Sequence, residues 1–178
     1  MDLFEEKISS KLIHNGDFLV LNKDTVLLPN GKTSTREFVT HPGAACIVAV
    51  DEDDNILMVK QYRYPISKVM YEVPAGKLDS GEEPINCAKR ELEEETGYKA
   101  NNFDLIGSLY PAPAYSNEII YIYLATKLSK TNMNLDEDEF LVCEKIKISK
   151  VLEMIMNGQI TDAKTQIAVL KYLHLNNN

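Results

Sequence analysis

Three glutamates near the middle of the chain, Glu91, Glu94 and Glu95, have the residue type and spacing of a metal site. Residues three and four apart on a helix are neighbours, so these side chains would share one face. Like charges at such spacings repel by roughly 0.2–0.5 kcal/mol per pair, and carboxylates in a last turn face the negative end of the helix dipole. Arg90, four residues before Glu94, offsets only part of this repulsion. A divalent cation would offset the rest, so the pattern predicts a cation on this face.

Residues 83–96 are predicted to form the helix that carries these carboxylates. Ser80, followed three residues later by Glu83, matches a capping box at its start. Pro84 suits a first helical turn, and Gly97 suits a left-handed C-terminal cap. The helix also has an apolar stripe that should face a core, formed by Ile85, Ala88 and Leu92.

The order of residues around the glutamates resembles the Nudix box. That motif is a glycine, five residues, a glutamate, seven residues, and then Arg-Glu-aliphatic-any-Glu-Glu-any-Gly-aliphatic. Here Gly76 is followed after five residues by Glu82, and after seven more by RELEEETGY at residues 90–98. Only Tyr98 departs from the pattern, at a position that affects packing rather than chemistry. An acidic run is more often a solvated surface, but the match at every other specified position favours the metal site.

Further stretches resemble the ADP-ribose pyrophosphatase branch of that family. Pro113 lies sixteen residues after Gly97, which is the distance that marks the branch. Ala112 and Ala114 depart from it, since they replace the usual serine and glycine. The other stretches that carry the resemblance are Arg36-Glu37, His41-Pro42-Gly43-Ala44, Gln61-Tyr62-Arg63, Glu72-Val73-Pro74-Ala75-Gly76 and Tyr115-Ser116-Asn117-Glu118.

Mg²⁺, with Mn²⁺ as a substitute, is the cation that the resemblance implies. Mg²⁺ binds through a few carboxylates and takes its other ligands from water and substrate phosphates. Glu91 and Glu95, one turn apart, can bind the same ion, and Glu94 can hold a second one or bridge by water. The family resemblance adds the backbone carbonyl of Ala75 as a ligand, with Glu82 as a support of the metal site.

Catalysis also needs the carboxylates to be oriented and one water to be activated. Arg90 is expected to orient the carboxylates from behind the metal. The general base stays open: the resemblance points to Glu139 or Glu137 on an acidic loop, whereas Glu94 or Glu95 of the box could act instead.

Five residues are expected to bind substrate. Arg36 and Arg63 suit its phosphates and ribose, because a guanidinium makes bidentate phosphate contacts. Phe18 is expected to stack on the adenine bound by a second subunit. Pro113 and Glu118 belong to the same predicted site, with Glu118 near the terminal ribose.

The reaction implied is hydrolysis of ADP-ribose to AMP and ribose 5-phosphate. One alternative is another Nudix substrate, namely a different nucleoside diphosphate sugar, a dinucleoside polyphosphate or an oxidised nucleotide. The other is a catalytically silent Nudix-like domain that binds ADP-ribose as a sensor. Missing box carboxylates would indicate the sensor, and none is missing.

An α/β (α+β) fold must position these residues: an α/β/α sandwich around a mixed sheet, with an N-terminal β-meander. The meander occupies residues 1–41, with strands at 7–14, 18–28 and 32–41, and the hydrolase domain residues 42–178. The meander lacks an apolar set of its own, which favours a homodimer that exchanges these strands, as the resemblance also implies. Later strands are predicted at 44–50, 56–61, 69–73, 103–110, 119–125 and 140–148, and later helices at 149–156 and 162–175.

Composition limits the partners. The net charge of −8 argues against nucleic acid, since phosphate backbones select basic surfaces. No stretch approaches the roughly 18 apolar residues of a membrane span, and the N-terminus has no signal-peptide pattern. Cys46, Cys87 and Cys143 lack metal or redox spacing, so they predict free thiols in a reducing compartment, the cytoplasm.

Overall fold

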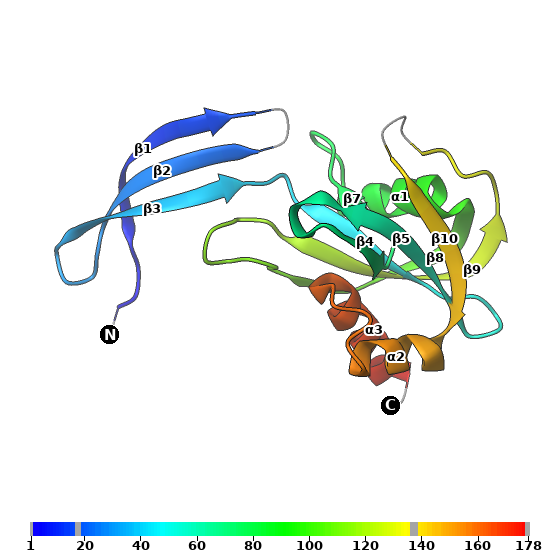
Figure 1. Cartoon of the computed structure of the whole chain (residues 1–178). Helices are drawn as coiled ribbons and strands as arrows, with labels where there is room; N and C mark the ends of the chain where they lie inside the picture. The colour runs from blue at the N-terminus through cyan, green and yellow to red at the C-terminus, as the bar shows by residue number, and fades with distance from the viewer. Residues whose placement is uncertain (1, 17–18, 136–138, 177–178) are drawn as a thin grey trace. The chain divides into compact units, whose positions relative to one another are not determined.

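The computed structural model describes residues 2–16, 19–135 and 139–176, and they form two compact units (Figure 1). Unit 1 comprises residues 1–42 and 112–118, and unit 2 comprises residues 43–111 and 119–178. The predicted division into residues 1–41 and 42–178 stays a prediction. No helix in the described ranges is long and apolar enough to cross a membrane.

Unit 1 contains one antiparallel sheet. Its strands follow each other in the order β1 (Glu6–Asn15), β2 (Val20–Leu27) and β3 (Thr33–Thr40), as expected for a meander. All ten residues of β1 are exposed. Among the described residues of this unit, only Asp24 and Val26 are buried, so the sheet has almost no core of its own.

The short segment 112–118 completes unit 1 by binding the end of β3. The Val39 N–H donates to the Tyr115 carbonyl oxygen at 2.8 Å, and the His41 N–H donates to Asn117 Oδ1 at 2.8 Å. The loop that carries Pro113 and Glu118 is therefore tied to the end of β3 by hydrogen bonds from the backbone of Val39 and His41.

Unit 2 is built on two sheets. One has the strand order β7-β4-β9-β8, in which β4 and β9 are parallel and the other pairs antiparallel. The other has the order β10-β5-β6 and is antiparallel throughout. The strands are β4 (Ala44–Ala49), β5 (Asn55–Arg63), β6 (Lys68–Glu72), β7 (Ala75–Lys77), β8 (Tyr98–Leu109), β9 (Ile120–Lys130) and β10 (Leu141–Lys147).

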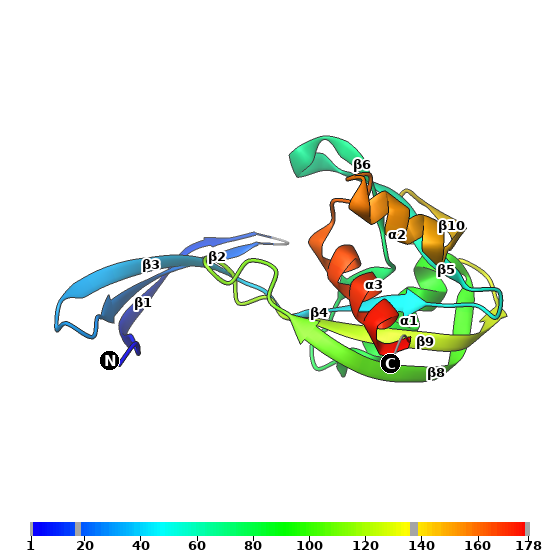
Figure 2. The same ribbon diagram turned by 90° about the horizontal axis from the view of Figure 1, so that it is seen from below.

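Helices cover both faces of β4, which is why all six residues of this strand are buried. Side chains alternate along a strand: Cys46 and Val48 join the core formed with α2 (Ile148–Met156) and α3 (Ala163–Asn176). Ala45 and Ile47 join the core formed with α1 (Pro84–Thr96). The α2 and α3 helices pack against each other (Figures 1 and 2). A short 3₁₀ helix, η1 (Tyr64–Ile66), follows β5. The predicted sandwich around a mixed sheet is confirmed, with β7-β4-β9-β8 as the mixed sheet and β10-β5-β6 as a second, antiparallel one.

The start of α1 differs from the prediction, although its extent agrees. The N-cap residue is Glu83 and makes no side-chain cap hydrogen bond, so the capping box at Ser80 was wrong. Gly81 is the reason: its φ of 76° is left-handed, so a helix cannot begin directly after Ser80. The other end agrees, since Gly97 has a φ of 68° and its N–H donates to the Glu93 carbonyl oxygen.

Candidate active site

Two glutamates of α1 lie on its buried side. Glu91 is 8% exposed and Glu95 only 3%, next to Cys87, Ala88 and Leu92, which pack in the core. Burial raises the pKa of Glu95 to about 8, and the neighbouring charges of Glu91 and Glu139 add to this rise. Burial likewise raises the pKa of Glu91. Desolvated carboxylates of this kind hold protons or cations.

The turn formed by residues 72–76, which runs from the end of β6 into the start of β7, faces these carboxylates. The Ala75 N–H donates to Glu95 Oε2 at 2.9 Å. A Cβ atom on Gly76 would lie 1.8 Å from Glu91 Oε1, so only glycine lets the backbone pass so close to this side chain. The backbone of Ala75 and Gly76 therefore lies directly against the carboxylates of Glu91 and Glu95 on α1.

Arg90 forms hydrogen bonds with three carboxylates of the box. Its guanidinium donates to Glu82 at 3.0 and 3.1 Å, to Glu91 at 2.7 Å and to Glu94 at 3.1 Å. It also donates to the Lys77 carbonyl oxygen at 3.1 Å. The hydrogen bonds that Arg90 donates to Glu82, and then the charge of Glu91, raise the pKa of Arg90 well above its ordinary value. Arg90 therefore contacts three carboxylates of the box, and its predicted orienting role stays a prediction.

The donor set fits a metal that needs few protein ligands. No group of three or more His, Cys, Asp or Glu residues within the described ranges could hold a metal ion. Two buried carboxylates beside a backbone turn do suit Mg²⁺ or Mn²⁺, which complete their coordination with water and phosphate. Glu95 supports this assignment, since Oε2 accepts a hydrogen bond from the backbone N–H of Ala75, which places the carboxylate beside the turn.

Comparison with known proteins decides the family. A model described as "NUDIX domain" matches residues 39–165, and one described as "Nucleoside diphosphate sugar hydrolase N-terminal domain" matches residues 5–39. The chain belongs to the Nudix family. It has 46% identity over 176 residues to the "Methanol dehydrogenase activator" of Bacillus methanolicus, covering 97% of this chain and 95% of that protein.

Two further relatives are informative. The "ADP-ribose pyrophosphatase" of Bacillus subtilis (strain 168) is 42% identical over 175 residues, covering 97% of this chain and 94% of that protein. A solved structure titled "Crystal structure of ADP compounds hydrolase" superimposes with a TM-score of 0.86 at 19% identity. The match covers 98% of this chain and 96% of that one, and it shows the fold.

Candidates for the general base of this Nudix hydrolase occupy different surroundings. Glu139 is exposed, and its charge contributes to the raised pKa values of both Glu91 and Glu95. Glu94 is paired with Arg90. Glu137 lies outside the described residues.

Arg63 is already engaged by a buried partner. Its Nε and Nη2 donate to the two oxygens of Glu72, both at 2.7 Å. Glu72 is 1% exposed and also pairs with Lys164. Although burial opposes it, these two cations lower the pKa of Glu72. Sequence reasoning gave Lys164 no role, and its signal was weak: a lysine at the third position of the helix predicted at residues 162–175, with no partner indicated by the sequence.

The substrate-binding candidates of unit 1 that the structure describes have partners or positions within that unit. Arg36 pairs with Glu5, with Nε to Oε2 at 2.8 Å. Glu118 lies 3.8 Å from His41 Nδ1, and its N–H donates to Ser116 Oγ at 3.1 Å. Pro113 is exposed in a turn. Phe18 lies outside the described residues.

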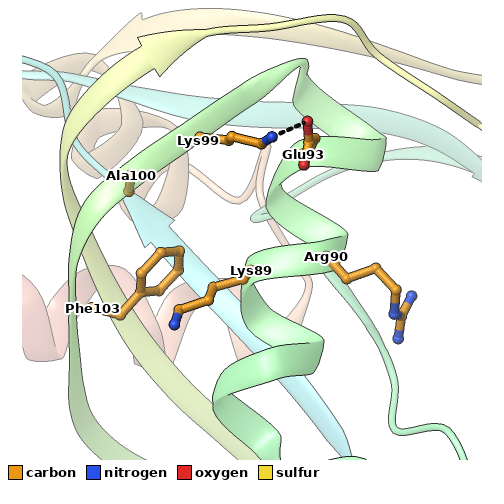
Figure 3. A pocket seen from close by; sticks show the side chains of 6 residues that line it. All are labelled: Lys89, Arg90, Glu93, Lys99, Ala100 and Phe103. Atoms are coloured by element: carbon orange, nitrogen blue, oxygen red, sulfur yellow. Dashed lines mark ion pairs between the residues drawn. The ribbon is translucent and has the colours of Figure 1, made fainter.

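A cavity of about 220 Å³ lies between α1 and β8 (Figure 3). It is lined by Lys89, Arg90, Glu93, Lys99, Ala100 and Phe103. Lys89 and Phe103 face each other there, with the ammonium 5.9 Å from the ring centre, and Lys99 pairs with Glu93 at 3.0 Å. Neither Glu91 nor Glu95 lines this cavity, but Arg90 does, so the cavity adjoins the carboxylate site through that residue.

Proposed function

We propose that this chain hydrolyses the pyrophosphate bond of ADP-ribose, giving AMP and ribose 5-phosphate. The observation that carries the proposal is the pair of buried carboxylates, Glu91 and Glu95, against the Ala75-Gly76 turn. The similarity to the ADP-ribose pyrophosphatase of B. subtilis supports the choice of substrate. One water adds to a phosphorus atom, one P–O bond of the bridge breaks, and the proton of the water balances the leaving phosphate.

The metal ligands in this proposal are Glu91, Glu95 and the Ala75 carbonyl, with Mg²⁺ as the resident ion and Mn²⁺ as a substitute. When bound, a divalent cation neutralises charge on the pyrophosphate and lowers the pKa of water. Arg90 keeps Glu91 oriented through its 2.7 Å hydrogen bond and keeps Glu82 and Glu94 beside it. Glu94 holds a second ion or bridges to it through water.

Glu139 is our preferred general base. Its electrostatic effect on Glu91 and Glu95 supports proximity to the metal ligands, and its exposure suits a group that must exchange protons with solvent. Glu137 on the same loop is the alternative, and Glu94 or Glu95 would act if neither does.

Substrate recognition in this proposal uses both units. Arg63 binds a phosphate on its half-exposed side while Glu72 holds its other edge. Arg36, Phe18, Pro113 and Glu118 of unit 1 bind the nucleotide of the second subunit in a homodimer that exchanges residues 1–41. The exposed strand β1 supports such an exchange, because an isolated three-stranded sheet needs a surface to cover it.

A substrate panel tests the proposal against its closest rivals. The purified protein is supplied with Mg²⁺ or Mn²⁺ and with ADP-ribose, other nucleoside diphosphate sugars, dinucleoside polyphosphates and an oxidised nucleotide, and the products are identified. ADP-ribose should give the highest kcat/KM. A higher value for another compound would reassign the substrate, and binding of ADP-ribose without turnover would indicate a sensor.

A second function, activation of a methanol dehydrogenase, is favoured by the 46% identity to the B. methanolicus activator over nearly the whole of both chains. Methanol oxidation by such a dehydrogenase should accelerate when this protein is added. If Glu95→Gln also abolishes the acceleration, activation depends on hydrolysis. No acceleration by the wild type would reject this function.

The compartment proposed is the cytoplasm. All three cysteines, Cys46, Cys87 and Cys143, are free, and reducing compartments keep thiols in that state. Fractionation of cells that express the protein tests this directly.

A further inference from the structure

A cluster of charged residues lies behind the turn that faces the candidate metal site. Arg63 ends β5, Glu72 ends β6, and Asp162 and Lys164 belong to the start of α3. Lys164 Nζ donates to Glu72 Oε2 and, at 3.1 Å, to Asp162 Oδ2. The side chain of Lys164 is 12% exposed and that of Glu72 is 1% exposed, so the contact is largely shielded from water.

The same segment holds the backbone of the turn. Val73 donates its N–H to Thr165 Oγ1 at 2.9 Å, and Thr165 is fully buried. The Thr165 hydroxyl in turn donates to Asp162 Oδ2 at 2.6 Å, and the Thr165 N–H donates to that oxygen at 2.9 Å. The start of α3 therefore contacts two consecutive residues of the turn, Glu72 by a charge and Val73 by a hydrogen bond.

The turn leads from these contacts straight to the carboxylates. Two residues after Val73, the Ala75 N–H donates to Glu95 Oε2 at 2.9 Å. Between them, the Pro74 carbonyl oxygen accepts from the Ile47 N–H at 2.9 Å, which ties the turn to β4. A shift of Glu72 or Val73 would thus be passed to Ala75 through three residues of backbone whose hydrogen bonds tie them to α3, β4 and α1.

The cluster balances two carboxylates, Glu72 and Asp162, with two cations, Arg63 and Lys164. Arg63 alone already donates to both oxygens of Glu72. Lys164 adds contacts that join Glu72 to Asp162 and so tie the end of β6 to α3. Beyond neutralising charge, these contacts therefore fix where the Glu72 carboxylate lies relative to α3.

We propose that Lys164, held by Asp162 and assisted by Thr165, is a positioning residue that fixes the Glu72–Ala75 turn in the geometry needed for metal binding. The inference rests on the metal site of the proposed function and not on its substrate. Lys164 touches neither metal nor substrate in this account, and it acts through Glu72 and the turn.

Charge and position make opposite predictions for Lys164→Met. If Lys164 acted only as a nearby positive charge, its removal would strengthen the binding of a cation. If it positions the turn, removal weakens binding, by roughly 10- to 100-fold as for other residues that support metal ligands. Lys164→Arg keeps the charge and the donors, so it should recover most of the affinity.

The experiment is a titration of the full-length protein with Mn²⁺, in which free Mn²⁺ is followed by electron paramagnetic resonance. Lys171→Met is the matched control, because Lys171 is exposed on the same helix. Thr165→Val removes the acceptor of the Val73 N–H without changing charge, and it decides the question if Lys164→Met does not fold. Thermal unfolding of each variant checks that the fold is retained.

We expect weaker Mn²⁺ binding for Lys164→Met and for Thr165→Val, recovery in Lys164→Arg, and wild-type binding in Lys171→Met. Equal or tighter binding in folded Lys164→Met, or unchanged binding in Thr165→Val, would overturn the inference. The titration contains no nucleotide, so a failure of ADP-ribose hydrolysis would reject the proposed substrate while leaving this result to stand.

Discussion

The sheet of unit 1 and the strand β4 of unit 2 represent two opposite ways of building a β structure. Every residue of β1 is exposed, whereas every residue of β4 is buried between two helical layers. Unit 1 also exposes large apolar side chains, each at least 46% exposed: Leu3, Phe4, Ile8, Leu12, Ile13 and Leu19. Unit 2 thus contains its own core, whereas the described residues of unit 1 bury almost none, although unit 2 also exposes large apolar side chains such as Tyr64 and Phe140.

The difference separates chemistry from assembly. The box carboxylates, the Ala75-Gly76 turn and the Lys164 cluster all belong to unit 2, whose core holds them in place. Changes at the box carboxylates of unit 2 should therefore affect catalysis without affecting assembly, whereas loss of unit 1 should affect both assembly and nucleotide binding.

The largest effect on catalysis is expected from Glu95→Gln. The amide keeps the size of the side chain but cannot bind a cation as a carboxylate does, so turnover of ADP-ribose should fall by several orders of magnitude. The fold should survive, because the change removes a buried charge that repels Glu91. Steady-state kinetics and thermal unfolding of the metal-free protein measure the two effects. Clear destabilisation of the metal-free variant would show that Glu95 is structural.

Substitution of the proposed base should have the next largest effect. Glu139→Gln and Glu137→Gln are compared, and one of them should lower kcat by about a hundredfold with little change in ADP-ribose binding. Glu144→Gln, in β10 nearby in sequence, serves as a control for surface charge. Near wild-type kcat in both loop variants would place the base within the box.

Deletion of residues 1–41 tests the other side of the comparison. Because β1 to β3 lack a core, we expect the truncated protein to be monomeric or aggregated and to bind ADP-ribose weakly, with every box residue still present. Light scattering and calorimetric titration report assembly and binding separately. A well-behaved, fully active monomer would contradict both the exchanged dimer and the role of unit 1 in binding.

A smaller effect concerns the pH dependence of stability. Burial raises the pKa of Glu95 from 4.5 to about 8, so its contribution to stability is fully present below pH 4.5 and is lost as the pH rises through about 8. The Tm of the metal-free wild type should fall across this window relative to that of Glu95→Gln. The groups that act on Glu95 are the Ala75 N–H and the side chains of Glu91, Glu139, Lys164, Arg63 and Cys143. Parallel Tm curves for the two proteins would show that Glu95 has an ordinary pKa.

Local features of this fold could be predicted from the sequence, and features that depend on pairing could not. The helix of the box and its Gly97 cap were predictable because both follow from residues within a few positions. Strand β7 was missed because Ala75–Lys77 has no strand pattern and becomes a strand only by pairing with β4. The Lys164 contact with Glu72 joins residues 92 positions apart, and no local pattern indicates it.

For the candidate site, too, the positions that follow from local spacing could be predicted, and the contacts that depend on strand pairing could not. The spacing of Glu91 and Glu95 indicated a shared face, and both side chains lie buried on α1. The binding of Arg63 by Glu72 was not predicted, since it depends on the register of β5 with β6. The roles of the base and of the unit 1 residues stay predictions.

The most direct test of metal-dependent hydrolysis at Glu91 and Glu95 is a chelation and add-back assay with ADP-ribose. The protein is treated exhaustively with a chelator, assayed, and assayed again after addition of Mg²⁺ or Mn²⁺, with AMP and ribose 5-phosphate quantified together. We expect no products after chelation and equal amounts of both after the cation is restored. Undiminished turnover in the chelated protein, or no turnover with either cation, would contradict the account.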